Sequence, residues 1–192
     1  MDDHPSASLV PFEAHGTYRD ALGSEAITWA ITPYVGTSRK QPSFEIRTTI
    51  RGVDLAGFDF DRLEPTEHDS AAEAGVPLDA WRNLTACVLS GTLPSTIERD
   101  GQLLGVEIEF ELDLRSGETL RLRCAIENET VESTDTRFED AMLQLGRAMP
   151  EGTTFSCCIS CSFSDYLPGG NGVTGMSCHR RDKQQYLAPG RS

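Results

Sequence analysis

The sequence predicts a mainly β protein of the α+β class: an antiparallel sandwich or curved sheet with one packed amphipathic helix. Three observations lead to this prediction: short apolar runs that alternate with polar residues, glycine-containing hairpin signals between them, and one helical stripe near residues 136–149. The chain has 192 residues and no Pro/Ser-rich linker. We therefore expect residues 1–192 to form a single domain with a full hydrophobic core.

The amino-terminal part of the chain lacks a long regular pattern. We expect residues 1–24 to be irregular, whereas residues 26–35 and 44–53 are rich in β-branched and aromatic residues and predict strands. An acidic surface loop is expected over about residues 61–80, with room for a helical turn. Residues 54–79 contain eight carboxylates and one Lys or Arg residue, Arg62. We interpret them as a solvated surface and not as a docking face for a basic partner.

The middle of the chain predicts two hairpins. Residues 106–114 alternate between apolar and polar, as in a strand with one buried face. Asp100-Gly101 precedes this strand and signals a two-residue turn, and residues 115–117 fit a three-residue hairpin loop. The second loop sets a register with four cross-strand pairs: Leu112–Leu120, Phe110–Leu122, Glu111–Arg121 and Glu109–Arg123. We therefore interpret the acidic row as sheet pairing and not as a cation site.

One helix is predicted after these strands. Its apolar stripe follows helical spacing, with Phe138, Ala141, Met142, Leu145, Ala148 and Met149 on one face. Thr136 and Glu139 have the spacing of a capping box, and Pro150 and Gly152 end the helix. We expect the helix to lie across a sheet, with its methionines as core residues.

Charge and composition exclude several classes of partner. The formal net charge of −13 argues against nucleic-acid binding and against binding to anionic membranes. Residues 1–22 lack the basic and apolar regions of a signal peptide, so we expect a soluble, cytoplasmic protein. Six cysteines in a reducing compartment are then thiols or metal ligands and not disulfides. The oligomeric state is not indicated by the sequence.

Four of the six cysteines lie within 22 residues near the carboxyl terminus, at Cys157, Cys158, Cys161 and Cys178. Residues 155–164 alternate as a strand would, with Phe155, Cys157, Ile159, Cys161 and Phe163 on one side. We favour the interpretation that Cys157 and Cys161 are small core residues, as we expect for Cys87 and Cys124 in their own strands.

Two chemical alternatives remain for this segment. In the first, Cys158, Cys161 and Cys178 bind zinc, with Cys157 or His179 as the fourth ligand, although one Cys-x-x-Cys pair is an incomplete match. In the second, Cys158 or Cys178 is a reactive thiol whose thiolate is favoured by nearby basic residues. Asp165 or His179 is the candidate acid/base of such an enzyme, and no further catalytic residue is assigned.

A glycine-rich loop follows the cysteines. Residues 170–175 spell a dinucleotide fingerprint, but too little chain follows for the required helix and strand, so we reject that function. The loop is better suited to a ligand or partner surface. Its candidate binding residues are Ser164, Asp165, Tyr166, Asn171 and Arg180. Trp29 and Trp81 lack interleaved basic residues, and we expect both in the core.

The carboxy-terminal motif resembles a known signature. It comprises Cys157-Cys158-x-x-Cys161-x-Phe163-Ser164-Asp165-Tyr166-x-Pro168, the Gly-rich loop, Cys178-x-Arg180 and Lys183-x-x-Tyr186-Leu187. This pattern, over about residues 134–187, resembles an uncharacterised family of bacterial proteins. The resemblance implies a bacterial cytosolic protein and no particular reaction.

Together these observations favour a non-enzymatic binding or regulatory module that presents the loop of residues 165–181 to a protein or a small ligand. The alternative is a metal- or thiol-dependent enzyme or accessory protein centred on Cys158, Cys161 and Cys178, with zinc as the candidate cofactor. Paired carboxylates in a cleft and a Ser/His/Asp order cannot be assigned from the sequence, which is why we prefer the binding module.

Overall fold

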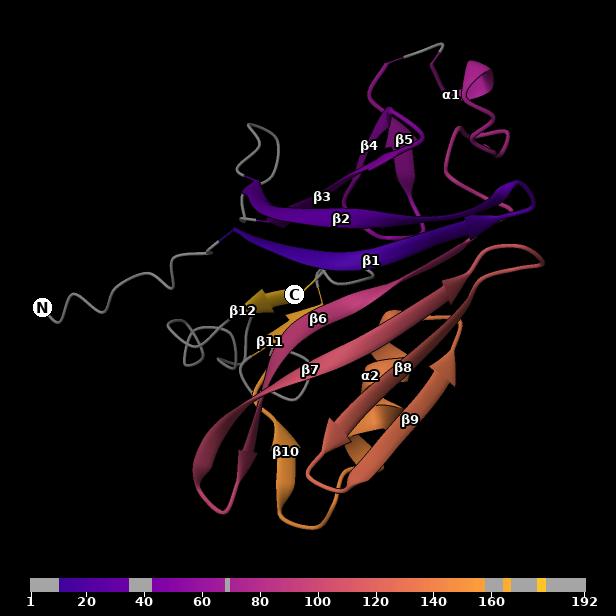
Figure 1. Ribbon diagram of the computed structural model, residues 1–192. Helices are drawn as coiled ribbons and strands as arrows, with labels where there is room; N and C mark the ends of the chain where they lie inside the picture. Colours follow the sequence, from indigo (N-terminus) through magenta and orange to yellow (C-terminus); the bar gives the residue numbers. More distant parts are fainter. Residues whose placement is uncertain (1–10, 35–42, 68–69, 158–163, 167–175, 179–192) are drawn as a thin grey trace, which may run out of the picture.

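The computed structural model describes residues 11–34, 43–67, 70–157, 164–166 and 176–178. Ten antiparallel strands form one sheet in the order β5-β4-β3-β2-β1-β6-β7-β8-β9, with β10 paired to β6. The prediction of a mainly β, antiparallel protein is therefore confirmed. Each strand in this order is hydrogen-bonded to the next. Strands β1–β5 run in a different direction from strands β6–β9 (Figure 1).

The first half of the sheet contains β1 (Phe12–Asp20), β2 (Gly23–Tyr34), β3 (Ser43–Ile50), β4 (Val53–Gly57) and β5 (Leu63–Pro65). Two sequence predictions were wrong here. Residues 1–24 are not irregular throughout, because β1 and the start of β2 lie among them. Residues 44–53 are not one strand, because Arg51 and Gly52 have positive φ angles and turn the chain from β3 into β4.

The segment predicted as an acidic loop contains the expected helical turn and also a strand that was not predicted. Strand β5 and the short helix α1 (Ser70–Glu73) both lie within residues 61–80. Leu63 and Ala71 are buried, which anchors this segment on the first half of the sheet. Trp81, which we expected in the core, is 82% exposed. The backbone turns directly after Trp81, at Arg82, which has a positive φ angle.

The second half contains β6 (Val88–Arg99), β7 (Gln102–Asp113), β8 (Thr119–Ile126), β9 (Glu129–Asp135) and β10 (Thr153–Phe155). Both predicted hairpins are confirmed. Asp100 and Gly101 have positive φ angles and join β6 to β7, as a two-residue turn requires. The four predicted pairs between β7 and β8 also form, including Glu111 opposite Arg121.

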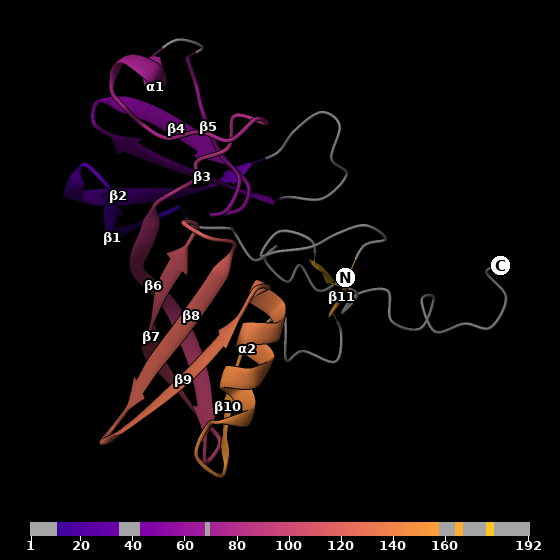
Figure 2. The same cartoon turned by 90° about the vertical axis from the view of Figure 1, so that its right-hand side faces the viewer.

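The predicted helix is α2 (Phe138–Arg147), which packs on β8 and β9 with Ala141, Met142 and Leu145 buried (Figure 2). The predicted capping box does not form. Arg137 is the N-cap residue, and no side chain caps the helix amides. Asp135 instead accepts hydrogen bonds from the backbone amides of Thr136 and Arg137, at 2.8 and 3.4 Å. Glu139 therefore has no capping role.

The two halves of the sheet meet where β1 pairs with β6 over four residues, Gly16–Arg19 with Val88–Gly91. Trp29, on β2, is fully buried at this junction, and its indole Nε1 donates a hydrogen bond to the Ser90 carbonyl at 3.1 Å. A Cβ atom at Gly16 would overlap both groups. The buried residues of both halves belong to one hydrophobic cluster, so the junction is part of the core.

Two of the cysteines lie in this core as predicted. Cys87 and Cys124 are 0% and 1% exposed. Burial raises the pKa of the Cys87 thiol to about 12, which keeps it protonated and unreactive at neutral pH. Of the strand predicted over residues 155–164, β10 includes only Phe155. Cys157 lies in a bend and is half-buried, and residues 158–163 lie outside the described residues. Within the described ranges, no helix is long and apolar enough to cross a membrane.

Candidate functional site

The carboxy-terminal residues proposed from the sequence are only partly described. Ser164, Asp165 and Tyr166 form strand β11 (Ser164–Tyr166), which pairs with β12 (Met176–Cys178). The register places Ser164 opposite Cys178, so these two candidates are neighbours in the backbone. Cys158, Cys161, Asn171 and Arg180 lie outside the described residues. Among the described side chains, no three His, Cys, Asp or Glu residues are grouped so that they could hold a metal ion.

A different site is found at the junction of the two halves. A cavity of about 160 Å³ lies between the β4–β5 connection, the buried face of β6–β8 and the amino-terminal end of α2. In Figure 2 this end of α2 points towards the first half of the sheet. Segments far apart in the sequence thus meet around one cavity. Its lining residues are Asp59, Phe60, Asp61, Arg62, Leu93, Phe110, Leu112, Glu118, Leu120, Thr136, Arg137, Phe138 and Glu139.

The apolar wall of the cavity is built on Trp29. Phe60 packs edge-on against the Trp29 indole with ring centroids 5.1 Å apart, and Phe110 lies 6.1 Å from the same ring. Phe60 and Phe110 contact each other at 4.7 Å. Because Trp29 is fixed by its hydrogen bond to Ser90, the two phenylalanines have a rigid support. The wall is therefore preformed.

The β4–β5 connection brings Phe60 to this position. Its chain turns tightly, with the Arg62 amide donating to the Asp59 carbonyl at 3.1 Å. Gly57 permits the turn, since a Cβ atom there would overlap the Arg62 carbonyl. At the exposed side of the connection, Arg62 Nε lies 3.6 Å from Asp61 Oδ2. This short segment supplies an aromatic ring and three charged groups to the cavity.

Glu139 is the distinctive polar group of the site. It is 4% exposed, lies in the first turn of α2 and lines the cavity. Its Oε1 atom is buried and has no hydrogen-bond partner among the described residues. Its Oε2 atom lies 3.9 Å from Arg137 Nε, beyond hydrogen-bond distance. The partial positive charge of the helix amino terminus favours a carboxylate here, but it does not satisfy the buried oxygen.

The charges around the cavity are predominantly negative. Four carboxylates and two guanidinium groups line it. Both arginines already have acidic neighbours, since Arg62 is close to Asp61 and Arg137 Nε lies 3.4 Å from Asp140. Burial and then the charge of Asp61 raise the pKa of the exposed Glu118 carboxyl at the rim above its ordinary value. The cavity therefore combines an apolar wall with an excess of negatively charged side chains.

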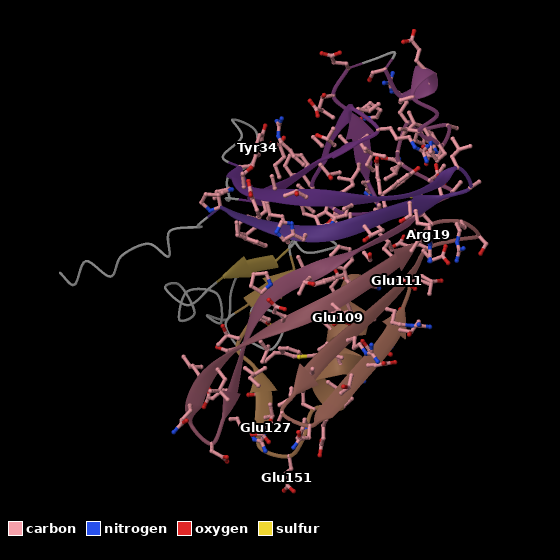
Figure 3. The ribbon with its side chains drawn as sticks, in the orientation of Figure 1. Arg19, Tyr34, Glu109, Glu111, Glu127 and Glu151 are labelled. Atoms are coloured by element: carbon pink, nitrogen blue, oxygen red, sulfur yellow. The ribbon has the colours of Figure 1, made fainter. Side chains whose placement is uncertain are left out.

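The opposite face of β7 and β8 is polar but has a simpler explanation. Figure 3 labels Glu109 and Glu111 along β7. Arg123 Nε pairs with Glu132 at 2.9 Å, and the Arg123 guanidinium also lies 3.9 Å from Glu109. These side chains are more than half exposed, so the pairs contribute little free energy and support the strand register. We assign this face a structural role.

A buried ionic cluster on β1 is also structural. Asp20 accepts hydrogen bonds from the Tyr18 hydroxyl at 2.6 Å and from Arg51 at 2.5 Å. The Arg51 interaction holds the pKa of Asp20 down at about 2, and burial raises the pKa of Tyr18 above its ordinary value. Asp20 also accepts from the Leu22 amide at 2.8 Å, so the cluster fixes the turn between β1 and β2.

The cavity was not predicted from the sequence. Glu139 was assigned to a capping box, although its position three residues before Met142 places it beside the apolar stripe of the helix. That spacing was the available signal for a buried carboxylate. Phe60 and Glu118 had no comparable signal, because their proximity depends on pairing between segments far apart in the chain.

Comparison with known proteins bears on the family of the chain and not on its activity. Neither curated proteins nor solved structures give a match. A model of a family of unknown function matches residues 13–164. This region includes every segment that lines the cavity. It ends before the Gly-rich loop of the carboxy-terminal motif. The chain belongs to the family of unknown function DUF6304.

Proposed function

We propose that this protein is a non-enzymatic binding module whose ligand is a small molecule held in the cavity at the amino-terminal end of α2. The cavity, with its phenylalanine wall and one buried carboxylate oxygen without a partner, is the observation that carries the proposal. Ligand sites are typically apolar hollows with a few well-placed polar groups, and this cavity has that composition.

The size of the cavity limits the ligand. At about 160 Å³ it is smaller than the pockets of drug-sized ligands, which begin at about 300 Å³. An apolar protein cavity of about 150 Å³ accepts benzene, so one benzene-sized group is the expected occupant. A larger ligand would extend past Glu118 into solvent.

Toluene is a suitable neutral probe of this proposal. We expect it to shift the NMR methyl signals of Leu93 and Leu120, which line the cavity. Leu93→Trp should fill the cavity and abolish the shift of the Leu120 methyl signals, while Leu103→Trp, at a position 66% exposed in β7, should leave toluene binding intact. Thermal unfolding of both variants checks that they remain folded, since overpacking costs about 1–3 kcal/mol. Unchanged toluene binding in Leu93→Trp, or none in the wild type, would refute the proposal.

The loop of residues 165–181 stays a predicted second surface of the same module, for a protein or a small ligand. The backbone pairing of Ser164 with Cys178 supports it, because this pairing brings the two ends of the loop together. The zinc or thiol enzyme centred on Cys158, Cys161 and Cys178 remains the alternative. Elemental analysis of protein purified without chelator, with Cys158→Ala and Cys178→Ala, tests it: near-stoichiometric zinc lost in both variants would favour the alternative.

A further inference from the structure

We infer that the cavity selects an organic cation, a protonated amine carried on a benzene-sized apolar or aromatic body. This inference rests on the proposed function and adds the chemical class of the ligand. It is carried by Glu139, whose buried Oε1 lines the cavity without a hydrogen-bond partner among the described residues. A buried carboxylate oxygen without a donor is costly, and a ligand ammonium would supply the missing donor.

The charge count favours a cation over an anion. The lining holds Asp59, Asp61, Glu118 and Glu139 against two arginines, and Asp140 lies just outside, 3.4 Å from Arg137. An anion at the amino-terminal end of α2 would meet Glu139 in the first turn. Repulsion from that carboxylate opposes the attraction that helix amides and arginines would otherwise offer.

The aromatic wall agrees with the same ligand class. Phe60, Phe110 and Phe138 all line the cavity. Ring faces attract a cation within about 6 Å of their centroids, and the attraction increases when water is excluded. A metal ion fits less well, because the described acidic residues do not group three ligands in one place. An amine on an apolar body uses both the carboxylate and the rings.

Benzylamine and benzyl alcohol test this inference, since they have nearly the same shape and differ in charge at neutral pH. NMR titration at pH 7 should show benzylamine binding at least about tenfold more tightly than benzyl alcohol, as a charge-assisted hydrogen bond implies. Glu139→Gln should remove this preference and leave benzyl alcohol affinity within about threefold. Glu151→Gln, beyond the other end of α2, is the matched control and should change neither affinity (Figure 3).

The possible outcomes test the ligand class and the binding function independently. Equal affinities of the two probes in the wild type would overturn the inference while the binding proposal stands. A benzylamine preference that survives Glu139→Gln would also overturn it, because the selectivity would then come from another group. Failure of both probes and of toluene to bind would refute the proposed function itself.

Discussion

Two acidic side chains in this protein are both buried, and their partners make them behave differently. Asp20 is satisfied on every side by Arg51, Tyr18 and the Leu22 amide. Glu139 has a buried oxygen without a partner among the described residues. A carboxylate with several donors stabilises the fold, whereas one without donors costs stability unless a ligand provides them. We therefore assign Asp20 to structure and Glu139 to binding.

Asp20 should make the protein acid-sensitive. Its hydrogen bond with Arg51 lowers the pKa to about 2 from an ordinary value of 3.8, so the stabilisation is complete above about pH 5 and is lost as the pH falls towards 2. Asp20→Asn should lower the free energy of unfolding at pH 7 by about 2 kcal/mol and flatten its dependence on pH between 5 and 2. Urea unfolding at a series of pH values measures both effects.

Asp113 provides the control for this prediction. Its pKa is also lowered to about 2, chiefly by the hydrogen bond from Arg115, but the Arg115 side chain is 56% exposed. Solvent screening should limit the loss in Asp113→Asn to under about 1 kcal/mol. Equal losses in the two variants, or an unchanged pH dependence in Asp20→Asn, would contradict the assignment of Asp20 to a buried network.

At the scale of elements, the decisive feature is the short pairing of β1 with β6. Gly16 and Gly91 face each other across it, and both lie against the Trp29 indole. The absence of side chains at these two positions lets the tryptophan fill the junction. Phe60 and Phe110 then pack on Trp29 and form the cavity wall. The glycine pair is thus a condition for the cavity.

Gly16→Ala tests the importance of this junction. The new methyl group would overlap the Ser90 carbonyl and the Trp29 indole, so we expect a loss of about 1–3 kcal/mol in the free energy of unfolding. Gly105→Ala in β7 is the matched control, because nothing lies within 4 Å of the added Cβ atom. It should change the free energy of unfolding by less than about 0.5 kcal/mol. Urea denaturation followed by circular dichroism distinguishes them. A Gly16→Ala variant as stable as the wild type would contradict the described packing.

The elements of this protein differ in how well the sequence predicted them. The β7–β8 register was predicted residue by residue, because turn type and alternation are local properties. Strand β1 was missed since Gly16 and His15 interrupt its apolar pattern, and exposed Trp81 was placed in the core on residue type alone. The cavity could not be predicted, because it requires β4–β5 to meet α2 across the sheet.

At the scale of the whole molecule, the two halves of the sheet share one hydrophobic cluster. Trp29 belongs to the first half and contacts Phe110 in the second. Separating the halves would open the cavity and expose Trp29 and the apolar surface packed on it, which costs free energy. We therefore expect the two halves of the sheet to unfold as one cooperative unit, as predicted for a single domain.

Native-state hydrogen exchange tests this cooperativity. The slowest amides of β2, at Trp29 and Ile31, and of β8, at Leu122, should exchange with the same free energy. That value should equal the global free energy of unfolding from urea denaturation. Distinctly lower protection throughout one half of the sheet would show that the halves unfold separately and that the cavity lies between two independent units.

The most direct test of the binding proposal is a crystal structure of the protein soaked with 4-bromobenzylamine, whose bromine atom gives an anomalous signal. We expect one bromine peak in the cavity beside Phe60 and Phe110, with the ammonium nitrogen about 3 Å from Glu139. A cavity without ligand at saturating 4-bromobenzylamine, or bromine bound only elsewhere on the protein, would contradict the assignment of this cavity as the binding site.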